Sequence, residues 1–176
     1  MFFSWAVSRY LLISFINLSL PYPEGKWLRG DVDLYAYWSI NLAKGRFPLN
    51  DEMWQYPPLA GFLFAVPKWI FQSGGNGFIA LMLIFDLLIL ITLVKFRKNY
   101  TNSHTGIWFW LLWPFVMGPL IFTRFDLAPS LFALLALIFL DKNYKHSLKI
   151  AGFFLSVGTL LKLWPILILV IVPRKK

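Results

Sequence analysis

The sequence predicts an all-α polytopic membrane protein, and three observations support this fold class. Of the 176 residues, 59% are hydrophobic and only 14% are charged, whereas soluble domains are about 45–50% apolar and about 25% charged. The apolar residues are gathered into long runs, as membrane-spanning helices require. Aromatic residues make up 19% of the chain, and many flank these runs, where such rings favour the membrane interface. We expect a single integral membrane module over residues 1–176.

Six apolar runs are the expected spans of this module. They lie near residues 5–20, 59–71, 78–94, 107–122, 127–140 and 150–172. A full span needs about 20 apolar residues, so the short second run, which Pro67 interrupts, is expected to be tilted or partial. Arg9, near the start of the first run, is expected to extend toward the cytoplasmic interface. This run has no small-residue cleavage site after it, so we interpret it as an uncleaved anchor.

The positively charged residues predict the topology. The net charge is +9, and Lys and Arg cluster in short loops at 95–98 and 142–149, which the positive-inside rule places in the cytoplasm. The loop 21–58 and the junction at Arg124 are then extracytoplasmic, or lumenal if the membrane is that of the endoplasmic reticulum. This topology requires that 59–71 does not cross independently; if it crosses, the later loops invert. Because membrane topology explains the basic charge, nucleic acid is not an expected partner.

The loop from Gly30 to Ala60 holds four of the chain's 8 acidic residues, and the chain has no cysteine for thiol chemistry. Residues 32–44 are predicted to form a helix in the membrane interface, with Gly45 as its stop. The side chains expected on its apolar face are Leu34, Tyr37, Trp38 and Leu42. Asp31 is placed at the N-cap and Asp33 in the first turn. Either acid can be purely structural, through capping or through the helix dipole.

Several motifs follow one another along this loop: Asp-Val-Asp at 31–33, an aromatic-rich helix, Lys-Gly-Arg-Phe-Pro at 44–48 and Gln-Tyr-Pro-Pro-Leu at 55–59. Their order resembles the first outer loop of GT-C glycosyltransferases. The resemblance is greatest to polyprenyl-phosphate-mannose-dependent mannosyltransferases, including the GPI mannosyltransferase I catalytic subunit and bacterial α-mannosyltransferases. It implies a GT-C-like helical bundle whose extracytoplasmic first loop carries an interfacial helix.

Later segments resemble this family in the same order. They are Phe85-Asp86-Leu87-Leu88, the junction from Arg124 to Pro129, and Lys162-Leu163-Trp164-Pro165. Gln55 departs from the pattern, because relatives often have an acidic residue before the tyrosine. The chain is also shorter than family members, so we interpret it as truncated: a fragment, a short gene product or half of a split enzyme. Further C-terminal spans or a membrane subunit are then expected partners.

The resemblance implies transfer of a hexose, with mannose expected, from a polyprenyl-phosphate sugar donor to a lipid or glycan acceptor with inversion. The acceptor hydroxyl needs a base. Asp31 is the first candidate, and Asp33 is either an orienting carboxylate or the alternative base. These two carboxylates can also hold a divalent cation such as Mg²⁺ or Mn²⁺. Such an ion is optional, because Arg or Lys can neutralise a monophosphate.

The leaving phosphate needs cations. A lysine inside an apolar run is a functional candidate by position, which makes Lys162 the first candidate and Arg124 the alternative. Tyr56 and Asp126 complete the expected substrate-binding residues. The structural alternatives are that Lys162 extends to a helix end and that Arg124 pairs with Asp126. Asp86 is expected to be structural, paired with a lysine or capping a broken helix.

Two other functions stay open at this point. A non-catalytic membrane subunit of a glycosyltransferase complex would keep the fold but need a partner for activity; the short length favours it, whereas the intact Asp-Val-Asp favours an enzyme. A transporter piece would use the charged residues of the apolar runs as an ion pathway. It would leave the acidic loop unexplained. Membrane lipids surround the protein in each case.

Overall fold

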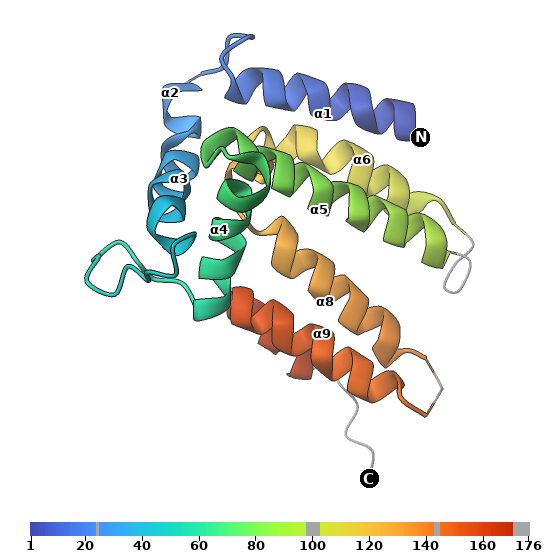
Figure 1. Cartoon of the computed structure of the whole chain (residues 1–176). Helices are drawn as coiled ribbons and strands as arrows, with labels where there is room; N and C mark the ends of the chain where they lie inside the picture. Colours follow the sequence, from blue (N-terminus) through green and yellow to red (C-terminus); the bar gives the residue numbers. More distant parts are fainter. Residues whose placement is uncertain (24, 98–102, 143–144, 171–176) are drawn as a thin grey trace.

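The computed structural model describes residues 1–23, 25–97, 103–142 and 145–170, and this part of the chain contains helices and no strands. The predicted all-helical fold is therefore confirmed for the described residues. Five helices lie side by side in one bundle (Figure 1). They are α1 (Phe2–Ile16), α5 (Gly75–Phe96), α6 (Thr105–Met117), α8 (Leu127–Leu140) and α9 (Ser147–Leu161).

Two further helices, α3 (Gly30–Leu42) and α4 (Pro58–Phe71), lie across one end of the bundle, and the short α2 (Gly25–Leu28) leads into α3 (Figure 1). The start of α4 follows from its prolines. Pro57 is extended (φ −59°, ψ 155°) and Pro58 takes the first helical position, where the missing N–H has no helical acceptor to lose. The crosswise α4 fits the topology in which 59–71 does not cross independently.

Helix length limits what can cross a bilayer. Among the described residues, only α5, with 22 residues, is both long and apolar enough to do so by itself. It extends about 33 Å, slightly more than the hydrocarbon thickness of about 30 Å. The remaining bundle helices have 13 to 15 residues, or about 20–22 Å. The multi-pass arrangement therefore stays a prediction.

Two predicted spans are interrupted in the structure. The run 107–122 divides at Gly118, whose φ of +65° is left-handed, into α6 and the short α7 (Leu120–Thr123). The run 150–172 leaves the α-helix after Leu161 and continues as the 3₁₀ helix η2 (Trp164–Val170), which packs against α8 and α9. Parts of the expected cytoplasmic loops (98–102 and 143–144) and the terminal Arg-Lys-Lys lie outside the described residues.

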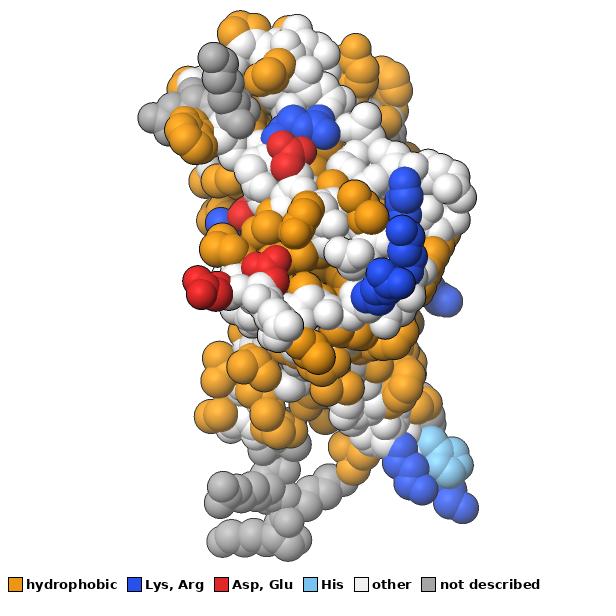
Figure 2. Space-filling view, turned by 60° about the vertical axis from the view of Figure 1, so that its left-hand side comes forward, with side chains coloured by type: hydrophobic (Ala, Val, Ile, Leu, Met, Phe, Trp, Pro, Cys, Tyr) orange, Lys and Arg blue, Asp and Glu red, His pale blue; other side chains and the backbone are white. Residues whose placement is uncertain are grey.

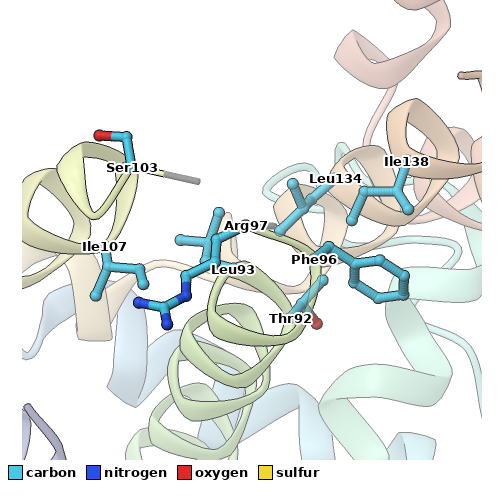
Figure 3. Close-up of a pocket in the computed structure, with 9 residues that line it drawn as sticks. Thr92, Leu93, Phe96, Arg97, Ser103, Ile107, Leu134 and Ile138 are labelled. Atoms are coloured by element: carbon cyan, nitrogen blue, oxygen red, sulfur yellow. The ribbon is translucent and has the colours of Figure 1, made fainter. Parts of the chain in front are cut away.

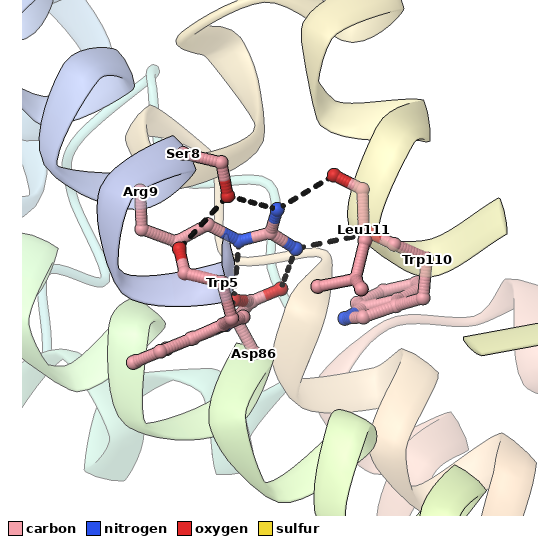
Figure 4. Close-up of polar contacts among 6 residues, drawn as sticks. All are labelled: Trp5, Ser8, Arg9, Asp86, Trp110 and Leu111. Carbon is pink, nitrogen blue, oxygen red and sulfur yellow. Dashed lines mark hydrogen bonds and ion pairs between the residues drawn. The ribbon is translucent and has the colours of Figure 1, made fainter. Parts of the chain in front are cut away.

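A buried ion pair connects α1 with α5 (Figure 4). Arg9 is 1% exposed and Asp86 is 0% exposed. Arg9 Nε lies 2.8 Å from Asp86 Oδ2, and Nη2 donates to Oδ1 at 3.1 Å. The expectation that Arg9 extends to the interface is therefore wrong, as is a lysine partner for Asp86. Burying two opposite charges in apolar surroundings costs less free energy when they form an ion pair than when each is unpaired.

Every N–H of the Arg9 guanidinium has an acceptor, and α6 supplies two of them. The other Arg9 donors reach Ser8 Oγ at 3.1 Å, the Leu111 carbonyl at 3.1 Å and the Trp110 carbonyl at 3.0 Å. The Trp110 carbonyl is available because Pro114, four residues later, has no N–H to donate to it. The ion pair thus holds α1, α5 and α6 together.

Cysteine labelling tests the side on which each loop lies, because the chain has no cysteine of its own. Single cysteines at residues 47–50 should react with an impermeant maleimide applied from outside the membrane. Cysteines at 145 or 146 should react only after permeabilisation, since their basic surroundings favour the cytoplasm. Labelling of both regions from the same side would contradict this topology.

Candidate functional site

The first turn of α3 presents two carboxylates that face different ways. The helix begins at Gly30 and its N-cap position is Arg29, so Asp31 lies inside the first turn and the prediction that it is the N-cap is wrong. Side chains two residues apart on a helix are rotated by about 200°. Asp31 faces Arg124, whereas Asp33 is 68% exposed and lies 3.9 Å from Arg29 Nε. In this arrangement the two carboxylates do not converge on one metal ion.

A short junction between α7 and α8 places opposite charges on either side of a buried ring. Phe125 is 1% exposed, and its burial directs the neighbouring Arg124 and Asp126 away from the core. Arg124 is extended (φ −115°, ψ 149°), and its Nε lies 2.8 Å from Asp31 Oδ2. Arg124 therefore pairs with the candidate base and not with Asp126, the partner considered from the sequence.

Lys162 lies where the chain leaves α9. Its backbone is extended (φ −154°, ψ 138°), three residues before Pro165. Lys162 Nζ is 2.6 Å from Asp126 Oδ1 and 5.1 Å from the centroid of the Phe125 ring. The lysine is thus held beside the α7–α8 junction by an ion pair and by a cation–π contact.

We call Asp31, Arg124, Asp126 and Lys162 the charged cluster. Figure 2, which brings the α3 end of the bundle forward, shows Asp and Glu side chains on this face with a broad apolar zone below them. The four side chains are 33–56% exposed. Ion pairs this exposed contribute about 0–1 kcal/mol to stability, so fold stability does not explain why three distant segments bring them together. All four were predicted as site residues.

Aromatic side chains pack against the cluster. The hydroxyl of Tyr56, a predicted substrate-binding residue, is 3.3 Å from that of Tyr35, and the Tyr56 ring packs edge-on against Phe125 with centroids 5.0 Å apart. Burial of Tyr35, together with its hydrogen bond to Tyr56, raises the Tyr35 pKa above its usual value. Tyr35 therefore stays a neutral phenol and is not a candidate base.

The sequence pattern had assigned Tyr37 to the apolar face of this helix, but Tyr37 is 60% exposed and Tyr35 is 2% exposed. The buried side chains of α3 are Val32, Tyr35, Trp38, Ser39 and Leu42. The predicted apolar face and the observed buried face both have helical spacing and share Trp38 and Leu42. Periodicity alone therefore could not show which face is buried. The position of α4, which packs against α3, decides which face is covered.

An apolar groove of about 410 Å³ opens beside the charged cluster, between α6, α7 and α8. Its apolar lining residues are Trp110, Trp113, Met117, Leu120, Ile121 and Leu127. Its charged lining residues are Arg124 and Asp126. A groove with apolar walls and charges at its edge fits an amphiphile with an apolar chain and a charged head. Sequence patterns alone do not predict this groove, because the packing of three helices creates it.

Comparison with known protein families identifies this chain. Residues 54–176, more than two thirds of the sequence, match the model of glycosyltransferase family 87. The matched segment includes Tyr56, Arg124, Asp126 and Lys162, whereas Asp31 precedes it. The comparison with curated proteins found no match, and neither did the comparison with solved structures. The predicted glycosyltransferase is confirmed at this level, and the sugar stays a prediction. The protein therefore belongs to glycosyltransferase family 87 and is a membrane glycosyltransferase of the GT-C type.

Proposed function

We propose that this glycosyltransferase transfers a hexose, with mannose expected, from a polyprenyl-phosphate donor to a lipid or glycan acceptor with inversion. The observation that carries the proposal is the position of the charged cluster beside the apolar groove. The groove would take the first part of the donor's isoprenoid chain. The charged cluster would then meet the phosphate and the sugar.

Arg124 and Lys162 are the proposed phosphate partners. Each cation is paired with one carboxylate, Arg124 with Asp31 and Lys162 with Asp126. A bound phosphate competes with both carboxylates, and the planar guanidinium can bind it through two parallel hydrogen bonds. These cations stabilise the charge that develops on the departing phosphate. Donor binding also separates Asp31 from Arg124, which leaves the carboxylate free to accept a proton.

Asp31 is the proposed general base. Its carboxylate accepts the proton of the acceptor hydroxyl while the hydroxyl oxygen attacks the anomeric carbon. The bond between the anomeric carbon and the phosphate oxygen breaks, and the lipid phosphate leaves with the electron pair. A single displacement inverts the anomeric configuration. Because Asp31 and Asp33 face different ways, we assign the phosphate charge to Arg124 and Lys162 and assign no divalent cation to the two acids.

A transfer assay tests the proposal. Purified protein in liposomes would receive polyprenyl-phosphate-linked mannose or another hexose, together with lipid and glycan acceptors. We expect a product whose anomeric configuration is opposite to that of the donor. Retained configuration, or transfer only from a nucleotide sugar, would contradict the proposal. Transfer that appears only when a second membrane subunit is added would instead favour the non-catalytic alternative.

Replacing the cations tests their role in donor binding. Lys162→Met and Arg124→Gln should each weaken binding of polyprenyl phosphate by roughly 10- to 100-fold, the usual effect of losing a hydrogen bond to a charged group. Fluorescence titration reports this affinity, because Trp110 and Trp113 line the groove. Lys68→Met is the matched control, since half-buried Lys68 lies on α4, away from the groove, and donates to the carbonyl of Gln72 just after that helix. An unchanged dissociation constant for Lys162→Met would exclude a phosphate contact.

A further inference from the structure

A second cavity, of about 190 Å³, lies near the other end of the bundle, between α5, α6 and α8. Its walls include Leu93 on α5, Ile107 on α6, and Leu134 and Ile138 on α8. Figure 3 shows the Arg97 side chain extending from the end of α5 toward Ile107. The cavity is therefore apolar inside and has a guanidinium at its edge.

Two more cations gather beside this cavity, around the ring of Phe96, which also lines it. Lys95 Nζ is 5.8 Å and Lys142 Nζ is 5.0 Å from the centroid of that ring. None of the ion pairs among the described residues includes Lys95, Arg97 or Lys142. Arg97 instead contacts the ring of His104, and Asp141 is the acid next to Lys142 in the chain. Lys95 and Lys142 thus flank one aromatic side chain, and Arg97 lies at another edge of the same cavity.

We propose that this end of the protein binds an anionic phospholipid. Part of one acyl chain would enter the cavity, and the phosphate would lie among Lys95, Arg97 and Lys142. A free phosphate would leave the cavity unused, and a neutral apolar lipid would leave the cations unused. A basic pocket between helices of a membrane protein is suited to anionic lipid headgroups, and each Lys or Arg near an anionic membrane adds measurably to binding. The site is independent of the charged cluster and of the proposed transfer.

Charge removal at the site is the first test. Arg97→Gln combined with Lys142→Gln should weaken binding of phosphatidylglycerol to the full chain in detergent by roughly 30-fold, from two cationic contacts. Lys145→Gln combined with Lys149→Gln removes the same charge from the start of α9, outside the cavity, and should change the affinity little. Native mass spectrometry measures retained phosphatidylglycerol against phosphatidylcholine. Equal losses in the two double variants, or equal retention of both lipids by the wild type, would overturn the proposal.

Filling the cavity is the second test and leaves the cations in place. Gly106 lines the cavity, and a Cβ added there would meet no heavy atom within 4 Å. Gly106→Leu therefore begins in open space at its Cβ, and it should reduce phosphatidylglycerol retention by about tenfold, as excluding roughly two methylene groups would. Unchanged retention would overturn the acyl-chain site. Inorganic phosphate binding as tightly as phosphatidylglycerol would show a headgroup site alone and would also overturn it.

Discussion

Replacement of Asp31 by Asn should lower the rate of sugar transfer by about 100-fold or more, the usual effect of removing a general base. Asn has nearly the same size and shape as Asp but cannot accept the proton of the acceptor hydroxyl. The measurement is the single-turnover rate of hexose transfer from a polyprenyl-phosphate donor in liposomes. Single turnover separates the chemical step from substrate binding and product release.

The fold and the donor site should survive this substitution. Asp31 is 36% exposed and its partner Arg124 is 56% exposed, so the ion pair contributes at most about 1 kcal/mol to stability. Loss of the Asp31 charge also removes a competitor for Arg124. The affinity for polyprenyl phosphate should therefore be unchanged or higher while transfer is lost. A purely structural role for Asp31 would not produce this combination.

Asp33→Asn is the matched control for this experiment. It makes the same chemical change two residues away on the same helix, at a side chain that faces Arg29. Its effect on transfer should be much smaller. Near-normal turnover by Asp31→Asn would reject Asp31 as the base. If Asp33→Asn were the inactive variant, the base would be Asp33, and the roles proposed for the two cations would remain.

The sequence predicted which residues gather at the candidate site better than it predicted how they pair. Asp31, Arg124, Asp126 and Lys162 were all candidates, because charges in a mostly apolar chain are costly without a function or a partner. Their partners depend on packing. Phe125 is buried, and the chain passes from an extended residue, Arg124, to a helical one, Asp126. The two side chains therefore meet different partners, Asp31 and Lys162. The spacing of these residues along the sequence does not show which of them will pair.

Local sequence signals determine some helix boundaries, and tertiary packing determines the orientation of other helices. The structure reproduces the predicted run 127–140 as α8, because an acidic residue flanks the apolar segment at each end. Hydropathy alone did not show that 107–122 and 150–172 would be interrupted, since apart from Lys162 no charged residue marks the breaks. Pro119 and Pro165 were the local signals there. The crosswise placement of α4 follows from contacts with α3, α5 and α9.

The pairing of Arg9 with Asp86 could have been inferred from the sequence but was not. Each residue lies alone in an apolar run, and an intramembrane charge is expected to pair. Pro114 was a second signal, because it leaves a helical carbonyl without its usual donor. Arg9 uses that carbonyl together with the Asp86 carboxylate.

Asp86→Ala should destabilise the protein by about 3–5 kcal/mol, because it leaves the Arg9 guanidinium buried without its counter-charge. Arg9 is 1% exposed, and its remaining acceptors are the Ser8 hydroxyl and two carbonyls, which carry no negative charge. The Trp5 indole N–H also loses its acceptor. The measurement is thermal unfolding in a mild detergent, followed by tryptophan fluorescence. Asp33→Ala is the control, and since its ion pair is exposed it should change stability by less than about 1 kcal/mol.

Removal of both buried charges should recover most of this loss. Arg9→Met combined with Asp86→Leu leaves no unpaired ion, and replacement of a buried ion pair by apolar side chains of similar volume is often neutral or stabilising. The Trp110 carbonyl then loses the donor that replaces its missing helical bond, so recovery should fall short of complete by about 1 kcal/mol. A double variant as unstable as Asp86→Ala would show that the hydrogen bonds to α6, rather than charge neutralisation, hold α1 in the bundle. Recovery to near wild-type stability would show that the ion pair contributes little net energy and mainly fixes where α1 packs.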